Sequence, residues 1–206
     1  TLCMTAMLSA QNPAERYEQR YDMLVSQFGA AGVGVETVLD NWEKVDSTNA
    51  KLLLARFNYL FTKAQSVSVV MKDNKKYLGM EPILTFKDSL QRNVYCYQET
   101  FFDDELYGKA VKAVDKAISF HPDRLDFRFV KANALIAYEK ESPDMAMNYL
   151  RSLVAEASRR SADWLYEGSK VGKDFVQEAT KEYCFSFYSI GSVRSRDAFL
   201  ILSLLL

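Results

Sequence analysis

The stretch Tyr107-Gly-Lys-Ala-Val-Lys-Ala-Val-Asp-Lys-Ala-Ile-Ser-Phe-His-Pro122 decides the predicted fold of this chain. Its apolar residues recur every three or four positions, so they share one face of an α-helix. Ala110 and Ala117 lie two helical turns apart on that face. Pro122 cannot continue a helix, because it lacks a backbone N–H and its ring clashes with the preceding turn. The stretch therefore predicts a helix that ends before Pro122.

Helical spacing of apolar residues continues on both sides of this stretch. The further helices that it predicts cover residues 17–28, 35–42, 53–61, 127–138, 142–153, 175–190 and 194–206. Their connections are only a few residues long, which places consecutive helices antiparallel. With eight glycines and four prolines in the chain, the predicted fold class is all-α. The last helix ends at Leu204-Leu205-Leu206 without a capping residue, so we expect a C-terminal truncation.

Composition and charge argue against several functions. The 206 residues are 49% apolar, enough for one domain with a sizeable core, and 26 basic residues stand against 27 acidic ones. The charges are scattered rather than gathered into the basic stripe that a phosphate backbone requires, so no nucleic-acid partner is expected. A single histidine, His121, rules out a multi-histidine zinc site and argues against a His-dependent catalytic triad. The sequence predicts no catalysis, no metal and no cofactor.

The cysteines and the acidic triplet carry no chemistry on sequence evidence. Cys3, Cys96 and Cys184 are far apart, and no two form a CxxC pair. Cys96 and Cys184 stand among aromatic residues, where a free cysteine packs as a small apolar residue; a disulfide between them is the alternative. The triplet at 103–105, Asp-Asp-Glu, precedes the helix at 107–122 and is interpreted as its N-terminal cap rather than as a metal site.

The spacing of Ala110, Ala117 and Pro122, with Phe101 before them and Ala132 after them, resembles the tetratricopeptide repeat. In this family two antiparallel helices cross closely at small residues, and a proline ends the second helix of each pair. The helices that the resemblance pairs are 94–101 with 107–122, and 127–138 with 142–153. The resemblance implies antiparallel helical hairpins that stack as a superhelix over residues 12–206.

The resemblance is strongest over residues 91–155 and weaker over 33–62. Ala110 and Ala146 are 36 residues apart, whereas the family period is about 34, so two extra residues lie in the turn at 140–144. Gln98 stands where the family has glycine or alanine after the aromatic residue. This departure weakens the predicted first helix at 94–101.

Proteins of this family bind an extended peptide or a partner's helix in a concave groove that the first helices line. On three predicted first helices, polar residues recur two turns apart and therefore share a side. The residues predicted to line the groove are Lys51, Asn58, Arg92, Glu99, Asp126 and Asn133. Asparagine amides can hold a peptide backbone, and lysine or arginine can hold a carboxylate. The alternative is that these six residues are solvated surface positions.

Residues 66–90 interrupt the helical pattern. Val67-Ser-Val-Val-Met71 and Pro82-Ile-Leu-Thr-Phe86 are short runs with high β-propensity, and a polar cluster at 72–76 separates them. We expect a small β-hairpin or an ordered loop here, inserted between helical hairpins. Such an insertion is a candidate for the specificity of the protein.

Residues 1–11 are small, apolar and uncharged, and a charged run follows them. They resemble the C-terminal part of a secretory signal peptide, with a small-residue cleavage site near Ser9 and Ala10. The alternative is a short apolar first helix. The signal-peptide interpretation predicts a periplasmic or secreted protein. No stretch of 18 consecutive apolar residues follows, so no membrane span is expected.

Together these observations predict an exported protein- or peptide-binding scaffold of the tetratricopeptide-repeat type, with an unidentified protein or peptide partner. The alternative is a small-ligand-binding protein or an enzyme accessory domain that uses a cleft beside residues 66–90.

Overall fold

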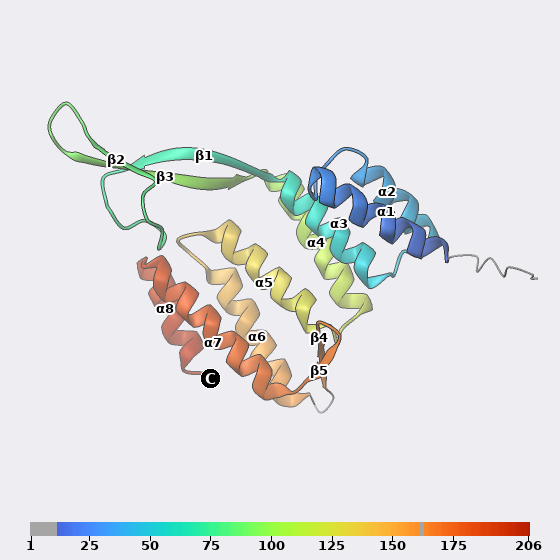
Figure 1. Ribbon diagram of the computed structural model, residues 1–206. Helices are drawn as coiled ribbons and strands as arrows, with labels where there is room; N and C mark the ends of the chain where they lie inside the picture. Colours follow the sequence, from blue (N-terminus) through green and yellow to red (C-terminus); the bar gives the residue numbers. More distant parts are fainter. Residues whose placement is uncertain (1–11, 161–162) are drawn as a thin grey trace, which may run out of the picture.

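The computed structural model describes residues 12–160 and 163–206 and is mostly helical (Figure 1). Its helices are α1 (Pro13–Phe28), α2 (Val35–Val45), α3 (Ala50–Lys63), α4 (Asp104–Phe120), α5 (Leu125–Glu139), α6 (Asp144–Arg159), α7 (Lys173–Ile190) and α8 (Val193–Ser203). The signal peptide predicted within residues 1–11 lies outside the described residues. Helices hold 61% of the described residues, so the expected helical character is confirmed, but the all-α class is wrong because the chain also forms a sheet.

The helices pack as hairpins in chain order. α1 packs on α2, α3 on α4, α5 on α6 and α7 on α8, and the second helix of each hairpin contacts the first helix of the next. Ala110, Ala117, Ala132 and Ala146 all have 0% of their surface exposed within these contacts. Their predicted burial is confirmed, since only small residues fit where helices cross closely.

Local sequence explains where the helices begin and end. The Asn49 side chain accepts hydrogen bonds from the first N–H groups of α3, and the Asp103 side chain accepts one from the Leu106 N–H at the start of α4. The acidic triplet therefore caps a helix, as predicted. Gly29 and Gly191 end α1 and α7 with positive φ angles, a conformation that glycine adopts without steric cost.

The main departure from the predicted fold lies at residues 93–102. They form the strand β3 (Asn93–Phe102), which lies between β1 (Gln65–Lys72) and β2 (Leu84–Lys87) in an antiparallel sheet of order β1-β3-β2. The predicted first helix at 94–101 is therefore wrong. Valine, tyrosine and phenylalanine dominate this segment and favour a strand once partner strands are present.

Because β3 pairs with both extended runs, the structure of the insertion at residues 66–90 differs from the predicted one. The extended runs predicted within 66–90 exist, but each pairs with β3 and not with the other, so the predicted hairpin is wrong. We call residues 65–102 the β arm. It joins α3 to α4, and these two helices pack on each other. The insertion thus lies within a helical hairpin rather than between two hairpins.

The β arm leaves the α3–α4 hairpin and extends past the ends of the C-terminal helices, as Figure 1 shows. A second, smaller sheet consists of β4 (Trp164–Tyr166) and β5 (Ser169–Val171), joined by a turn with positive φ at Glu167 and Gly168. Trp164 is buried against α5, α6 and α7 in the core. The small sheet therefore forms part of the connection between α6 and α7.

Candidate functional site

The structure distributes the six predicted groove residues over helices and the β arm. Lys51 and Asn58 lie on α3, and Asp126 and Asn133 lie on α5, each pair seven residues apart as expected. The Lys51 ammonium is engaged by the carboxylates of Glu18 and Asp22, each 2.8 Å away. A peptide held by Lys51 would have to displace these ion pairs.

Asp126 is engaged as well. Its carboxylate accepts hydrogen bonds from Arg124 Nε at 2.8 Å and from a terminal guanidinium nitrogen of the same residue at 2.6 Å. Asn133 is exposed on α5. The four helical residues therefore remain a predicted groove, in which Lys51 and Asp126 already have partners.

Arg92 and Glu99 do not lie on a helix, which corrects the prediction for both. Arg92 lies in the turn before β3 and pairs with Asp88, whereas Glu99 lies in β3 itself. Because neither residue is helical, the spacing of seven that would place them on one side of a helix does not apply. The structure does not bring this pair to a shared groove.

Glu99 instead fastens the β arm to the helices. It is only 7% exposed, and its carboxylate accepts hydrogen bonds from the Lys140 ammonium in the α5–α6 turn and from the Tyr77 hydroxyl at 2.9 Å. Burial alone would raise the pKa of Glu99, but the hydrogen bonds from Lys140 and Tyr77 keep the pKa below its ordinary value. Glu99 is therefore held charged against the helical body.

The loop between β1 and β2 folds back in the same region. The Tyr97 hydroxyl donates to the Lys75 carbonyl oxygen at 2.6 Å, and the Tyr77 and Tyr97 rings contact each other with centroids 5.3 Å apart. Gly79 has a φ of +72°, and a Cβ at this position would lie 2.7 Å from the Ser189 carbonyl oxygen of α7. These contacts hold the arm on the α5–α6 turn and on the end of α7.

The opposite face of the sheet is apolar and exposed. Cross-strand partners share a face of an antiparallel sheet, and the register pairs both Met71 and Leu84 with Cys96. Alternation along the strands adds three residues to this outer face. Its large apolar residues are Val67, Val69, Met71, Leu84 and Phe86, which are 38–66% exposed. Cys96 is buried between its neighbours as a free thiol, and Cys184 is a free thiol in α7.

One edge of the sheet is also open. β1 pairs with β3 along its whole length, and within residues 12–160 and 163–206 no strand pairs with its other edge. β1 carries one charged residue, Lys72, and no proline. Natural proteins usually protect such an edge with charges, proline or a covering element. The outer face and the β1 edge therefore form a surface that is chemically suited to a partner.

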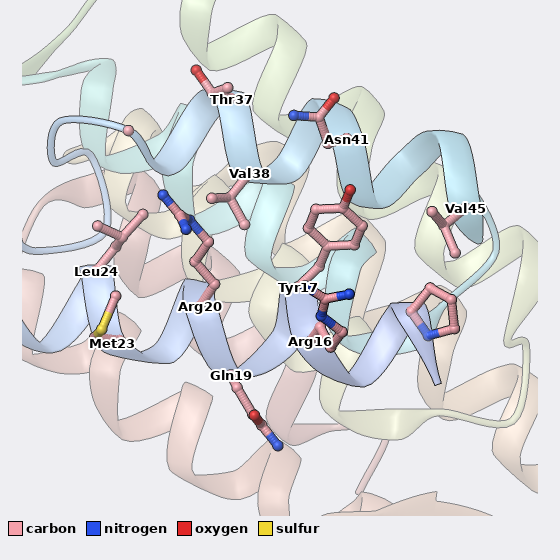
Figure 2. A pocket seen from close by; sticks show the side chains of 12 residues that line it. Arg16, Tyr17, Gln19, Arg20, Met23, Leu24, Thr37, Val38, Asn41 and Val45 are labelled. Carbon is pink, nitrogen blue, oxygen red and sulfur yellow. The ribbon is translucent and has the colours of Figure 1, made fainter. Parts of the chain in front are cut away.

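A groove of about 770 Å³ lies between α1 and α2, at the N-terminal hairpin rather than beside the β arm. Figure 2 shows that the Tyr17 ring stands between the two helices and that the Arg20 side chain extends from α1 toward α2. Leu24, Val38 and Val45 supply apolar walls. This groove is therefore not the cleft that was expected beside residues 66–90.

The described residues hold neither a membrane-spanning helix nor a group of three or more histidine, cysteine or acidic side chains that could bind a metal ion. The outer face of the β arm is not among the binding residues predicted from the sequence. Its signal was present, because Val67, Val69 and Met71 alternate with polar residues and Val70 in a strand pattern. What the pattern could not show is that none of the described residues covers this apolar side.

Comparison with known proteins gives no match, whether with a family model, a curated protein or a solved structure.

Proposed function

We propose that this protein is a protein- or peptide-binding scaffold without catalysis of its own, and that the outer face and open β1 edge of the β arm bind the partner. The observation that carries the proposal is the exposed apolar face formed by Val67, Val69, Met71, Leu84 and Phe86. Contiguous apolar patches on the surface of a soluble protein mark interaction sites.

The inner face of the β arm is attached to the helices, so its outer face is held in place before a partner binds. Glu99 and Tyr97 hold its inner face and its loop, while the outer face carries the apolar side chains. A rigid surface loses little conformational entropy when a partner binds, so more of the contact energy contributes to affinity. An extended segment of the partner could add to the β1 edge through main-chain hydrogen bonds.

The helical part of the proposal is a tetratricopeptide-like solenoid that carries the arm. Two findings support it: the hairpins pack in chain order, and the alanines of the predicted repeat register are buried at 0% exposure. In this interpretation α3 and α4 are the first and second helices of one repeat, and the arm is an insertion between them. Periplasmic or secreted localisation is also part of the proposal, and it rests on the composition of residues 1–11.

A photo-crosslinking experiment tests the binding surface. A benzoylphenylalanine at Val69 should capture a defined partner in an extract of the native host, and the same probe at Val33 should not. Val33 is 85% exposed in the α1–α2 connection, so it is at least as accessible as Val69. Equal products from the two positions would contradict the proposal.

Two matched triple variants then distinguish specific binding by the β arm from nonspecific apolar association. Val67→Ser, Val69→Ser and Met71→Ser together should abolish capture by a probe at Phe86, because the partner loses its apolar contacts. The control combines Val33→Ser, Met145→Ser and Val193→Ser, which remove the same residue types from exposed positions elsewhere. Capture that is lost equally in both triple variants, or in neither, would contradict the proposal.

A further inference from the structure

The groove between α1 and α2 holds cations that the fold does not neutralise. Arg16 and Arg20 lie one turn apart on α1 and line the groove. In the described part of the chain, neither makes a hydrogen bond or an ion pair through its side chain. Lys44 of α2 does not line the groove, but its ammonium donates at 3.1 Å to the side-chain oxygen of Asn41, which does.

Five of the six acidic residues of α1 and α2 form ion pairs with α3 or α4, and the sixth, Glu15, is exposed and does not line the groove. Glu18 and Asp22 of α1 face α3, where both pair with Lys51. The ion pairs of α2 with α3 and α4 are Glu36–Lys63, Asp40–Arg56, Glu43–Arg56 and Glu43–Lys116. These five acidic side chains thus pair across to α3 and α4, and the described residues that line the groove include two arginines and no acidic residue.

The groove is lined by apolar residues as well as by arginines, so its chemistry suits a ligand with both negative charge and apolar groups. Leu24, Val38 and Val45 line it together with the ring of Tyr17. Figure 2 shows the Arg20 side chain and the Tyr17 hydroxyl both directed from α1 toward α2, with Val38 between them. An inorganic anion would satisfy only the arginines, whereas a ligand that also carries apolar groups would cover the walls.

We propose that the α1–α2 groove binds an extended acidic peptide segment in which carboxylate side chains alternate with apolar ones. The Cα atoms of Arg16 and Arg20 are about 6 Å apart along the helix axis. Alternate residues of an extended chain point to the same side and are roughly 6.6 Å apart, so each of two carboxylates meets one guanidinium. The residue between them then points toward the α2 wall at Val38 and Val45.

This site is separate from the β arm and does not depend on what the arm binds. The two surfaces lie on different helical hairpins, because the groove belongs to α1 and α2 and the arm joins α3 to α4. Variants of one surface should therefore leave binding at the other unchanged.

The probe is a synthetic peptide, acetyl-Leu-Glu-Leu-Glu-Leu-amide, titrated into the ¹⁵N-labelled full chain and followed by NMR. We expect shifts confined to the backbone amides of α1 and α2. Replacing both glutamates of the peptide by glutamine should weaken binding by about tenfold or more, since hydrogen bonds between charged groups are the strong ones. Added salt should weaken the acidic peptide more than the neutral one.

Arg16→Ala with Arg20→Ala should weaken binding of the acidic peptide by about tenfold or more and leave the glutamine peptide unchanged. The matched control is Arg194→Ala with Arg196→Ala, which removes the same charge from exposed positions on α8. Equal affinity for both peptides, or unchanged affinity in the groove variant, would overturn the proposal. Inorganic phosphate that binds as tightly as the acidic peptide, with the same dependence on the arginines, would overturn the peptide assignment.

Discussion

Gly79 shows how one residue fixes the position of the β arm. Its φ of +72° is unfavourable for any residue with a Cβ, and a Cβ would also lie 2.7 Å from the Ser189 carbonyl oxygen. Backbone contact between the arm loop and α7 therefore requires glycine. The Lys140–Glu99 ion pair and the Tyr97 hydrogen bond complete the attachment.

Gly79→Ala should release the arm loop from α7. We expect faster hydrogen exchange over residues 73–83 and a loss of stability that exceeds the roughly 1–3 kcal/mol of backbone strain alone. Gly168→Ala is the matched control, because Gly168 has a φ of +81° but a Cβ added there would meet no atom within 4 Å. Equal losses of stability in the two variants would show that the close contact between Gly79 and α7 does not contribute to stability.

Glu99 makes the attachment of the arm pH-dependent. Its pKa in the folded protein is below the ordinary value of 4.5, so the charged form favours the docked arm. The stabilisation is complete above the ordinary pKa and is lost as the pH falls through the lowered pKa. Hydrogen exchange of the arm at decreasing pH, corrected for intrinsic rates, should show this loss in the wild type. Glu99→Gln should show weaker docking at neutral pH and no such dependence below pH 4.5.

At the scale of elements, the helices were predictable and the central strand was not. Periodic apolar residues and caps such as Asn49 and Asp103 locate helices from local sequence alone, because both act within one or two turns. The segment 93–102 carries both aromatic residues at helical spacing and strand-forming residues. Its state is decided by pairing with β1, whose partner residues lie about 30 positions away. No local pattern contains that information.

Ala117→Leu tests the helix crossing that the sequence predicted. Ala117 has no exposed surface in the core between α3, α4 and α5, so a larger side chain should cost roughly 1–3 kcal/mol of unfolding free energy through overpacking. Ala155→Leu is the control, because Ala155 lies in a helix but is exposed. It should change stability by less than about 0.5 kcal/mol in urea denaturation. Equal effects would show that the crossing at Ala117 is not closely packed.

The partners of the charged residues in the groove and in the β arm could not be predicted from the sequence either. Arg16 and Arg20 lie one turn apart on a helix that the sequence predicts. That they have no partner among the described residues could not be predicted, because the acidic residues Glu18 and Asp22 of the same helix pair with Lys51 of α3 instead. Likewise Arg92 and Glu99 were placed in a helical groove by spacing, and the strand gives Glu99 a structural part instead.

At the scale of the whole molecule, hairpins that pack in chain order carry one long insertion whose inner face is fixed and whose outer face is free. This arrangement separates stability from recognition: the core residues of α3, α4 and α5 hold the fold, while the outer face of the arm contributes little to it. Changes on that face should therefore alter binding far more than unfolding free energy.

Hydrogen exchange of the protein with its captured partner bound tests the central claim most directly. If the arm binds the partner, the amides of β1 and β2 become slower to exchange, and most of all those of β1 that face its open edge, while α3 and α5 stay unchanged. Protection centred on Lys51, Asn58, Asp126 and Asn133, with β1 exchanging as in the free protein, would contradict the claim and place the partner in the helical groove.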